Sequence, residues 1–160
     1  MSDSTLAYYN KNADLFVAST ANAEMSAQYS TFLRHLKPSA SILDLGCGSG
    51  RDSKFFLDAG YYVEAVDGSS ELCNIASSFI GKNVRQLMFE ELDYVEMFDA
   101  VWACASLLHI PKAGLPNILH KIGNALKENG IIYASFKYGN FLEKEMVAFL
   151  QTLQNKVLMR

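Results

Sequence analysis

The sequence predicts a single α/β domain in which a mostly parallel sheet of about five strands carries helices on both faces. Three observations lead to this prediction. Short, nearly all-apolar segments, as expected for strands buried on both faces, alternate with segments of helical periodicity. A glycine-rich turn directly follows the first of the apolar segments. The chain has 160 residues and is 50% hydrophobic, which suits one well-filled core.

Two helices are expected before the sheet, over residues 4–18 and 22–36. The first has apolar side chains at the spacing of one helical face, namely Leu6, Tyr9, Ala13 and Phe16. This face should therefore pack against the rest of the domain. Pro38 interrupts the second pattern, because proline lacks the N–H group that a continuing helix requires.

The core of the domain, over residues 41–136, alternates strands with helices. Apolar segments predict strands over residues 41–45, 62–66, 84–89, 98–103 and 131–136. Segments of helical spacing predict helices over residues 51–59, 70–79 and 113–127. Parallel neighbours need right-handed crossovers, so few topologies remain, and a Rossmann-like sandwich is the expected one. In such a sheet, ligands bind beyond the carboxyl ends of the strands where the chain order reverses.

The end of the chain is expected to be a helix over residues 141–159. Its apolar residues recur at helical spacing: Leu142, Met146, Phe149, Leu150, Leu153 and Val157. No strand is expected after residues 131–136, so that strand would lie at an edge with unpaired N–H and C=O groups. We expect this edge to be covered by the terminal helix, or by a second copy of the chain in a homodimer.

The turn after the first strand reads D-x-G-x-G-x-G, from Asp44 to Gly50. Glycines at such a turn allow positive φ and let a ligand approach main-chain N–H groups closely. The dinucleotide pattern G-x-G-x-x-G would need a third glycine where this chain has Arg51, which argues against a nicotinamide oxidoreductase. An acid at Asp44 suits a cationic ligand. The turn therefore predicts a binding site for a small, positively charged adenosine derivative.

A second acid, Asp67, ends the second predicted strand. A carboxylate at that place can accept hydrogen bonds from both vicinal hydroxyl groups of a ribose. The alternative is an acid in the first turn of the next helix. That helix, however, already has Ser69 or Ser70 as its N-cap and Glu71 in its first turn.

Composition excludes several other functions. The net charge is −3 and the basic residues are scattered, so nucleic acid is not an expected partner. Cys47, Cys73 and Cys104 are too few and too far apart for a metal site. An odd number of cysteines without a signal peptide predicts reduced thiols and a cytoplasmic protein, and no membrane association is expected.

Residues 8–138 resemble the class I methyltransferases that use S-adenosylmethionine (SAM), particularly the tellurite-resistance-like members that act on small molecules. The resemblance rests on the acid and glycines of the first turn, on the loop over residues 48–53, on Asp67, and on residues 103–109. It implies the class I methyltransferase sandwich, here shortened at its C-terminal end and without the family's terminal antiparallel hairpin. It also implies that residues 1–37 form a helical lid over the cofactor.

The resemblance further implies which residues meet the cofactor. They are Tyr8, Asp44, Gly46, Cys47, Gly48, Arg51, Asp67, Gly68, Ser69, Met88, Phe89, Glu90, Ala103 and Cys104. Residues 88–90 would hold the adenine, with Glu90 either an acceptor for its amino group or part of a plain surface loop. Tyr9 and His109 would border the methyl acceptor as catalytic residues, although a loop histidine can instead bond only to nearby backbone.

The function predicted in this way is transfer of the SAM methyl group to a small-molecule acceptor by in-line displacement. S-adenosylhomocysteine (SAH) is then the product, and no metal is required. The alternative is a shortened chain that binds SAM without turnover, as a sensor or a partner-binding module.

Overall fold

The computed structural model describes residues 3–135 and 156–159 of the chain. The helices in these parts are α1 (Asp3–Lys11), α2 (Ala13–Thr20), α3 (Ser26–Leu33), α4 (Arg51–Asp58), α5 (Ser70–Ile80) and α6 (Leu115–Ala125), with the 3-10 turns η1 (Phe89–Glu91) and η2 (Leu107–His109). The strands are β1 (Ser41–Leu45), β2 (Tyr62–Asp67), β3 (Arg85–Gln86), β4 (Phe98–Ala103), β5 (Leu126–Ala134) and β6 (Lys156–Met159).

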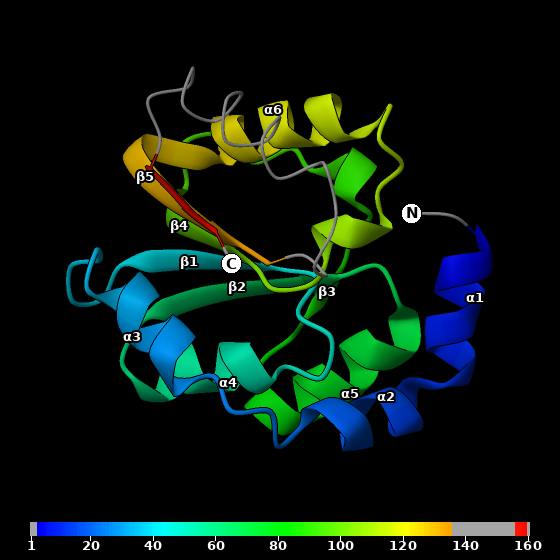
Figure 1. The fold of residues 1–160 in the computed structure, drawn as a ribbon. Helices are drawn as coiled ribbons and strands as arrows, with labels where there is room; N and C mark the ends of the chain where they lie inside the picture. The colour runs from blue at the N-terminus through cyan, green and yellow to red at the C-terminus, as the bar shows by residue number, and fades with distance from the viewer. Residues whose placement is uncertain (1–2, 136–155, 160) are drawn as a thin grey trace.

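The strands form one parallel sheet in the order β3-β2-β1-β4-β5-β6. Helix α6 covers one face, and α3, α4 and α5 cover the other (Figure 1). The chain order reverses between β1 and β4, which is where an open α/β sheet leaves a crevice for ligands. The predicted fold class, a Rossmann-like α/β sandwich, is confirmed, with six strands in the sheet where about five were predicted.

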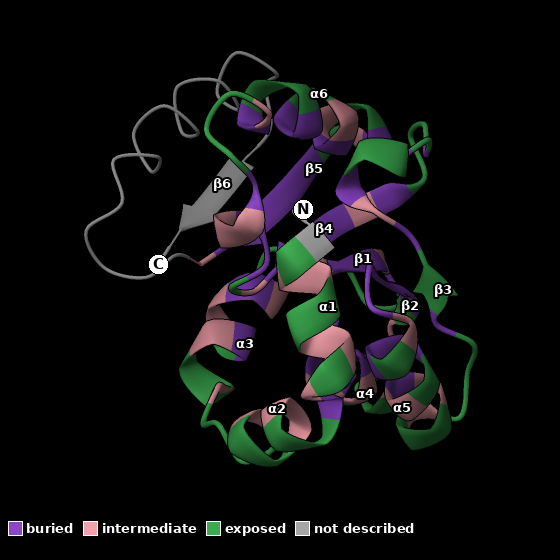
Figure 2. Ribbon diagram, turned by 90° about the vertical axis from the view of Figure 1, so that its right-hand side faces the viewer, coloured by how far each residue is buried: buried purple, intermediate pink, exposed green. Residues whose placement is uncertain are grey.

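Burial explains why the central strands were the easiest to predict. In Figure 2 the buried residues are concentrated in the strands and in the helix faces that meet them. Strand β1 is buried from Ile42 onward, and β4 is almost entirely buried. Strands covered on both faces are continuously apolar, so their sequence pattern is unambiguous. Both have the predicted bounds.

Two other strands differ from the prediction. The strand expected over residues 84–89 is only the two-residue β3, at the sheet edge, and Phe89 already begins η1. Strand β5 begins earlier than residue 131, because Leu126 pairs with Phe98 before the register shifts and resumes at Ile131. Asn129 has a φ of +62° within that irregular stretch, a conformation that asparagine tolerates better than most residues.

The end of the sheet corrects two expectations. Residues 156–159 were expected in a helix, but they form β6, which pairs in parallel with residues 131–134 of β5. The remainder of that expected helix, residues 141–155, lies outside the described residues. Pairing satisfies the N–H and C=O groups that β5 would otherwise expose, and this tertiary demand overrides the helical spacing of the sequence. The β5 edge is therefore occupied by β6 and is not open to a second copy of the chain.

The N-terminal segment lies beside the carboxyl ends of the strands. The first predicted helix is divided into α1 and α2 at Asn12, and α1 lies against α5. The second is shorter than expected and consists of α3 alone. The N-terminal segment thus consists of short helices placed next to the reversal of chain order.

Within the described residues, no helix is both long and apolar enough to cross a membrane.

Candidate functional site

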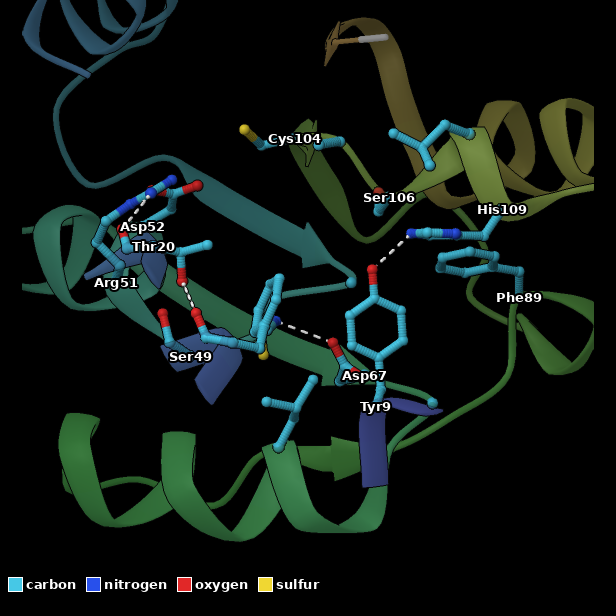
Figure 3. A pocket seen from close by; sticks show the side chains of 18 of the residues that line it. Tyr9, Thr20, Ser49, Arg51, Asp52, Asp67, Phe89, Cys104, Ser106 and His109 are labelled. Atoms are coloured by element: carbon cyan, nitrogen blue, oxygen red, sulfur yellow. Dashed lines mark hydrogen bonds and ion pairs between the residues drawn. The ribbon is translucent and has the colours of Figure 1, made fainter. Parts of the chain in front are cut away.

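A cavity of about 530 Å³ lies at the carboxyl ends of β1, β2 and β4, with α1 and α2 along its outer side. This volume is within the range of ~300–1,000 Å³ that is usual for small-molecule sites. Figure 3 shows Arg51, Asp52 and Thr20 at one end of the cavity and Tyr9, His109 and Phe89 at the other. Asp67 lies between the two groups.

The glycine turn after β1 forms the floor of this cavity. Gly46 has a φ of +80°, and its N–H donates to the carbonyl of Val66 at 2.9 Å. A Cβ on Gly46 would lie 2.5 Å from the Cβ of Ser106, in the loop after β4. The glycine therefore lets the loops after β1 and β4 meet at the point where the chain order reverses.

Gly48, another glycine of the turn, lies against helix α2. A Cβ on Gly48 would lie 2.9 Å from the ring of Phe16, which belongs to α2. The ring of Phe16 in turn meets the ring of Tyr9 edge-on, with centroids 5.2 Å apart. The aromatic face predicted for the N-terminal helix thus packs directly on the binding turn.

Asp67 joins the turn to the helix that follows β2. One carboxylate oxygen, Oδ2, accepts from the Gly48 N–H at 2.9 Å, and Oδ1 accepts from the Ser69 N–H at 2.9 Å. Burial raises the pKa of the Asp67 carboxyl above its ordinary value, although the donating N–H groups act in the opposite direction. Since a carboxylate offers about four acceptor positions, Asp67 retains acceptor capacity for a ligand.

Tyr9 and His109 meet across the cavity. The Tyr9 hydroxyl lies 3.0 Å from Nε2 of His109, and the two rings are arranged edge to face. Partial burial raises the pKa of the Tyr9 phenol, and the nearby carboxylate of Asp67 adds to the shift. The predicted pair of catalytic residues is therefore brought together by elements that are far apart in the sequence.

At the other end of the cavity, Asp52 holds three side chains. Its Oδ1 accepts from the Tyr29 hydroxyl and from Arg51 Nε, at 2.5 and 2.7 Å. Its Oδ2 accepts from Trp102 Nε1 at 2.8 Å. Arg51 Nη1 also donates to the Thr20 carbonyl at the end of α2, at 2.9 Å. This network connects α2, α3, α4 and β4.

Eleven of the expected site residues line the cavity: Tyr8, Tyr9, Gly46, Cys47, Gly48, Arg51, Asp67, Gly68, Phe89, Cys104 and His109. They come from α1, from the turns after β1 and β2, from η1 and from the segment after β4. The geometry therefore brings together the glycine turn, the predicted ribose acid and the predicted catalytic pair.

Asp44 does not line the cavity, contrary to expectation. It lies beneath the turn, is 2% exposed, and accepts a hydrogen bond from Ser53 Oγ. Burial raises the pKa of its carboxyl to about 8, and the negative charge of Asp52 adds to the effect. The acid supports the turn from below, through Ser53, and lies behind the cavity wall.

Four other expected residues also lie off the cavity wall, each with a structural reason. Ser69 caps α5 and donates to the Asn10 side chain, so its hydroxyl is already engaged. Met88 packs against Gly68, while Glu90 is exposed on η1. Ala103 is fully buried within β4. Sequence spacing located their segments but not the direction of their side chains.

Nine residues that line the cavity were not predicted: Phe16, Thr20, Met25, Ser49, Asp52, Leu72, Ala105, Ser106 and Leu108. Phe16, Thr20 and Met25 belong to the N-terminal segment, and local sequence patterns do not report how this segment packs on the sheet. One signal was available for Asp52. A tryptophan inside a buried strand needs an acceptor for its indole N–H, and Trp102 occupies such a strand.

Within the residues that the structure describes, no group of three or more histidine, cysteine or acidic residues is arranged to hold a metal ion. The three cysteines are free: Cys47 and Cys73 are buried, and Cys104 is half-buried.

Comparison with known proteins gives a family for the sequence. Residues 42–130 match the model of a family described as "Methyltransferase domain". No curated protein matches the chain in sequence.

Solved structures share the fold. A TehB-like SAM-dependent methyltransferase from Corynebacterium glutamicum is 18% identical, with a TM-score of 0.74, over 95% of this chain and 84% of that one. The [4+2]-cyclase SpnF is 17% identical, with a TM-score of 0.70, over 93% and 70%. A 1,6-didemethyltoxoflavin-N1-methyltransferase from Burkholderia thailandensis is 27% identical, with a TM-score of 0.62, over 79% and 56%; its structure holds 1,6-didemethyltoxoflavin and SAH.

Proposed function

The chain belongs to the methyltransferase domain family and is a SAM-dependent methyltransferase, and from this premise we propose that its methyl acceptor is a small molecule. The observation that carries the proposal is that α1 and α2 border the cavity on one side and narrow it to a small-molecule site. Tyr9 on α1 bonds to His109 behind β4, and Phe16 on α2 packs on the glycine turn. A compact acceptor fits such a site better than a segment of a folded macromolecule.

The residues around the cavity fit SAM. Gly46, Cys47 and Gly48 of the turn line the cavity, and at Gly46 the packed loop after β4 leaves no room for a Cβ. Asp67 retains acceptor positions that suit the two ribose hydroxyls. Phe89 offers an apolar wall for adenine on one side of Asp67, and Arg51 offers a cation for the methionine carboxylate on the other. These groups follow the order of the parts of the cofactor.

When bound, SAM supplies a methyl group on a positively charged sulfur, which a nucleophile can displace. The protein's contribution is alignment of the two reactants and exclusion of water, because no covalent intermediate is needed. The aromatic rings of Tyr8, Tyr9 and Phe16 line the lid side of the cavity. Their π faces favour a cationic sulfur by about 0.5–2 kcal/mol.

Tyr9 and His109 provide a route for the proton that an O–H or N–H acceptor must lose. In the tautomer of His109 that is protonated on Nδ1, the Tyr9 hydroxyl donates to Nε2. Tyr9 then receives the proton of the acceptor on its oxygen while its own proton passes to Nε2. This arrangement needs no other base.

A further argument for a small acceptor comes from two directions. The Burkholderia thailandensis enzyme, at 27% identity, holds a small heterocycle together with SAH. The present chain has a net charge of −3 and no concentration of basic residues in its sequence that would attract a polyanion.

Its three free cysteines are consistent with the reducing conditions of the cytoplasm, where we expect the protein to act.

Calorimetry and a turnover assay test the proposal together. Titration with SAH should show one site per chain, and incubation with SAM and a panel of small O–H, N–H and S–H compounds should release SAH together with a methylated product. Methylation of tRNA or protein alone would contradict a small-molecule acceptor. SAH binding without turnover of any acceptor would favour the sensor function instead.

A further inference from the structure

Asp52 lies at the cavity wall and is 6% exposed. Its carboxylate accepts from three donors, Arg51 Nε, the Tyr29 hydroxyl and Trp102 Nε1, at 2.5–2.8 Å. A carboxylate has about four acceptor positions, so three donors leave little capacity for a ligand. The geometry is that of a group which holds its neighbours in place.

Arg51, which Asp52 holds, uses only some of its N–H groups in hydrogen bonds within the protein. One N–H of Arg51 donates to Asp52 and another to the Thr20 carbonyl, at 2.7 and 2.9 Å. A guanidinium has five N–H groups, so much of its donor edge remains for a ligand. The Arg51 side chain is 21% exposed and lines the cavity. A guanidinium presented in this way is well suited to a carboxylate.

We propose that Asp52 is a positioning residue, which fixes Arg51 so that its guanidinium receives the carboxylate of the cofactor's methionine part. The proposal rests on the cofactor orientation of the proposed function. A free arginine side chain samples many rotamers, and fixing it before the ligand arrives lowers the entropic cost of binding. Tyr29 and Trp102 complete the support, because each donates to the same carboxylate from a buried position.

This arrangement determines which adenosyl compounds bind well. SAH carries adenosine, a thioether sulfur and a full amino-acid end. 5′-Methylthioadenosine keeps the adenosine and the sulfur but lacks the amino and carboxylate groups. Only SAH can use Arg51, so only SAH should depend on Asp52. A residue with a purely structural role would affect both ligands equally.

The test measures the dissociation constants of SAH and of 5′-methylthioadenosine by calorimetry. The variant Asp52→Asn keeps the shape of the side chain but loses its charge and one acceptor oxygen. It should weaken SAH binding about tenfold or more, as expected for a charge-assisted contact that is lost or misaligned. Binding of 5′-methylthioadenosine should change by less than about twofold, within ordinary variation. Asp58→Asn, an exposed acid of the same helix, is the matched control and should change neither.

A double-mutant cycle separates the positioning role from a direct one. Arg51→Gln should show the same selective loss of SAH binding, and the double variant should bind SAH no more weakly than Arg51→Gln alone. Additive losses, equal losses for both ligands, or no loss in Asp52→Asn would each overturn the proposal. If Asp52→Asn does not fold, Tyr29→Phe removes one donor to the same carboxylate and is judged by the same criteria. Absence of SAH binding in the unaltered protein would instead refute the proposed cofactor site.

Discussion

The hydroxyl of Tyr9 lies 3.0 Å from Nε2 of His109, although the two residues are separated by 100 positions in the sequence. Tyr9 belongs to α1 and His109 ends η2, so the bond fastens the N-terminal lid to the segment behind β4. The same bond joins two side chains that are candidates to handle the acceptor's proton. The contact between α1 and the segment behind β4 is therefore also the contact between the two candidate catalytic side chains.

Tyr9→Phe should separate catalysis from cofactor binding. The variant keeps the ring that packs on Phe16 but removes the hydroxyl that reaches His109. We expect kcat to fall about 10²-fold or more, which is the usual contribution of a general acid–base group, with the dissociation constant of SAH changed by less than about threefold. SAH release from an acceptor found in the panel measures the first quantity. Tyr62→Phe, at an exposed position, is the control, and an unchanged kcat in Tyr9→Phe would exclude the proton route.

Asp67→Ala should weaken SAH binding by roughly 2–4 kcal/mol, because two charge-assisted hydrogen bonds to the ribose are lost at about 1–2 kcal/mol each. The structure adds a second effect. The carboxylate also accepts the N–H groups of Gly48 and Ser69, so the variant should lose stability as well. Calorimetry gives the affinity and urea unfolding gives the stability. An unchanged SAH affinity in a folded variant would remove Asp67 from the site.

Gly46→Ala and Gly60→Ala form a matched pair, since both glycines have φ between +80° and +86°. At Gly60 an added Cβ meets nothing within 4 Å, so only the left-handed backbone costs free energy, about 1–2 kcal/mol. At Gly46 the Cβ would lie 2.5 Å from that of Ser106, which adds roughly 1–3 kcal/mol of overpacking. Urea unfolding should therefore show a larger loss of stability for Gly46→Ala than for Gly60→Ala. Equal losses would show that the loops after β1 and β4 separate easily.

Stability should depend on pH through Asp44. Its folded pKa of about 8 lies above its unfolded value of about 4, so the folded state retains a proton that the unfolded state loses between these limits. The free energy of unfolding therefore falls as pH rises from about 4 to about 8. The side chain of the Asp44→Asn variant has no such proton to lose. The variant should therefore be more stable than the unaltered protein by roughly 1–3 kcal/mol above pH 8.

The gain of Asp44→Asn should shrink toward pH 4, where both states of the unaltered protein are protonated. Urea unfolding at pH 4.5 and pH 8.5 measures the difference. Asp58→Asn, at an exposed position, is the control: it retains Asp44, so its stability should fall with rising pH as that of the unaltered protein does. A gain for Asp44→Asn that is the same at both pH values would contradict the assignment.

The sheet was predictable where burial is complete. Strands β1 and β4 have apolar residues on both faces, so their bounds could be predicted to the residue. The short edge strand β3 and the terminal strand β6 were not, because pairing at an edge depends on partners far along the chain. At β6 the helical spacing of the sequence was misleading, and the open edge of β5 was the better indication.

The site was predictable where a motif constrains the backbone. The glycine turn and Asp67 could be located because φ and strand ends leave few alternatives. Asp52 was missed because an acid in the first turn of a helix is common and suggests only a favourable charge at the helix terminus. Its role depends on Trp102 and Tyr29, which reach it only in the folded molecule.

Trp102 is the single tryptophan of the chain, and its indole N–H bonds to the carboxylate that holds Arg51. All indole emission of the protein therefore originates beside the binding cavity. A change in the charge or position of Asp52 alters the electric field at this one fluorophore. The protein thus contains its own optical probe, and occupancy of the site can be followed by stopped-flow spectroscopy without any attached dye.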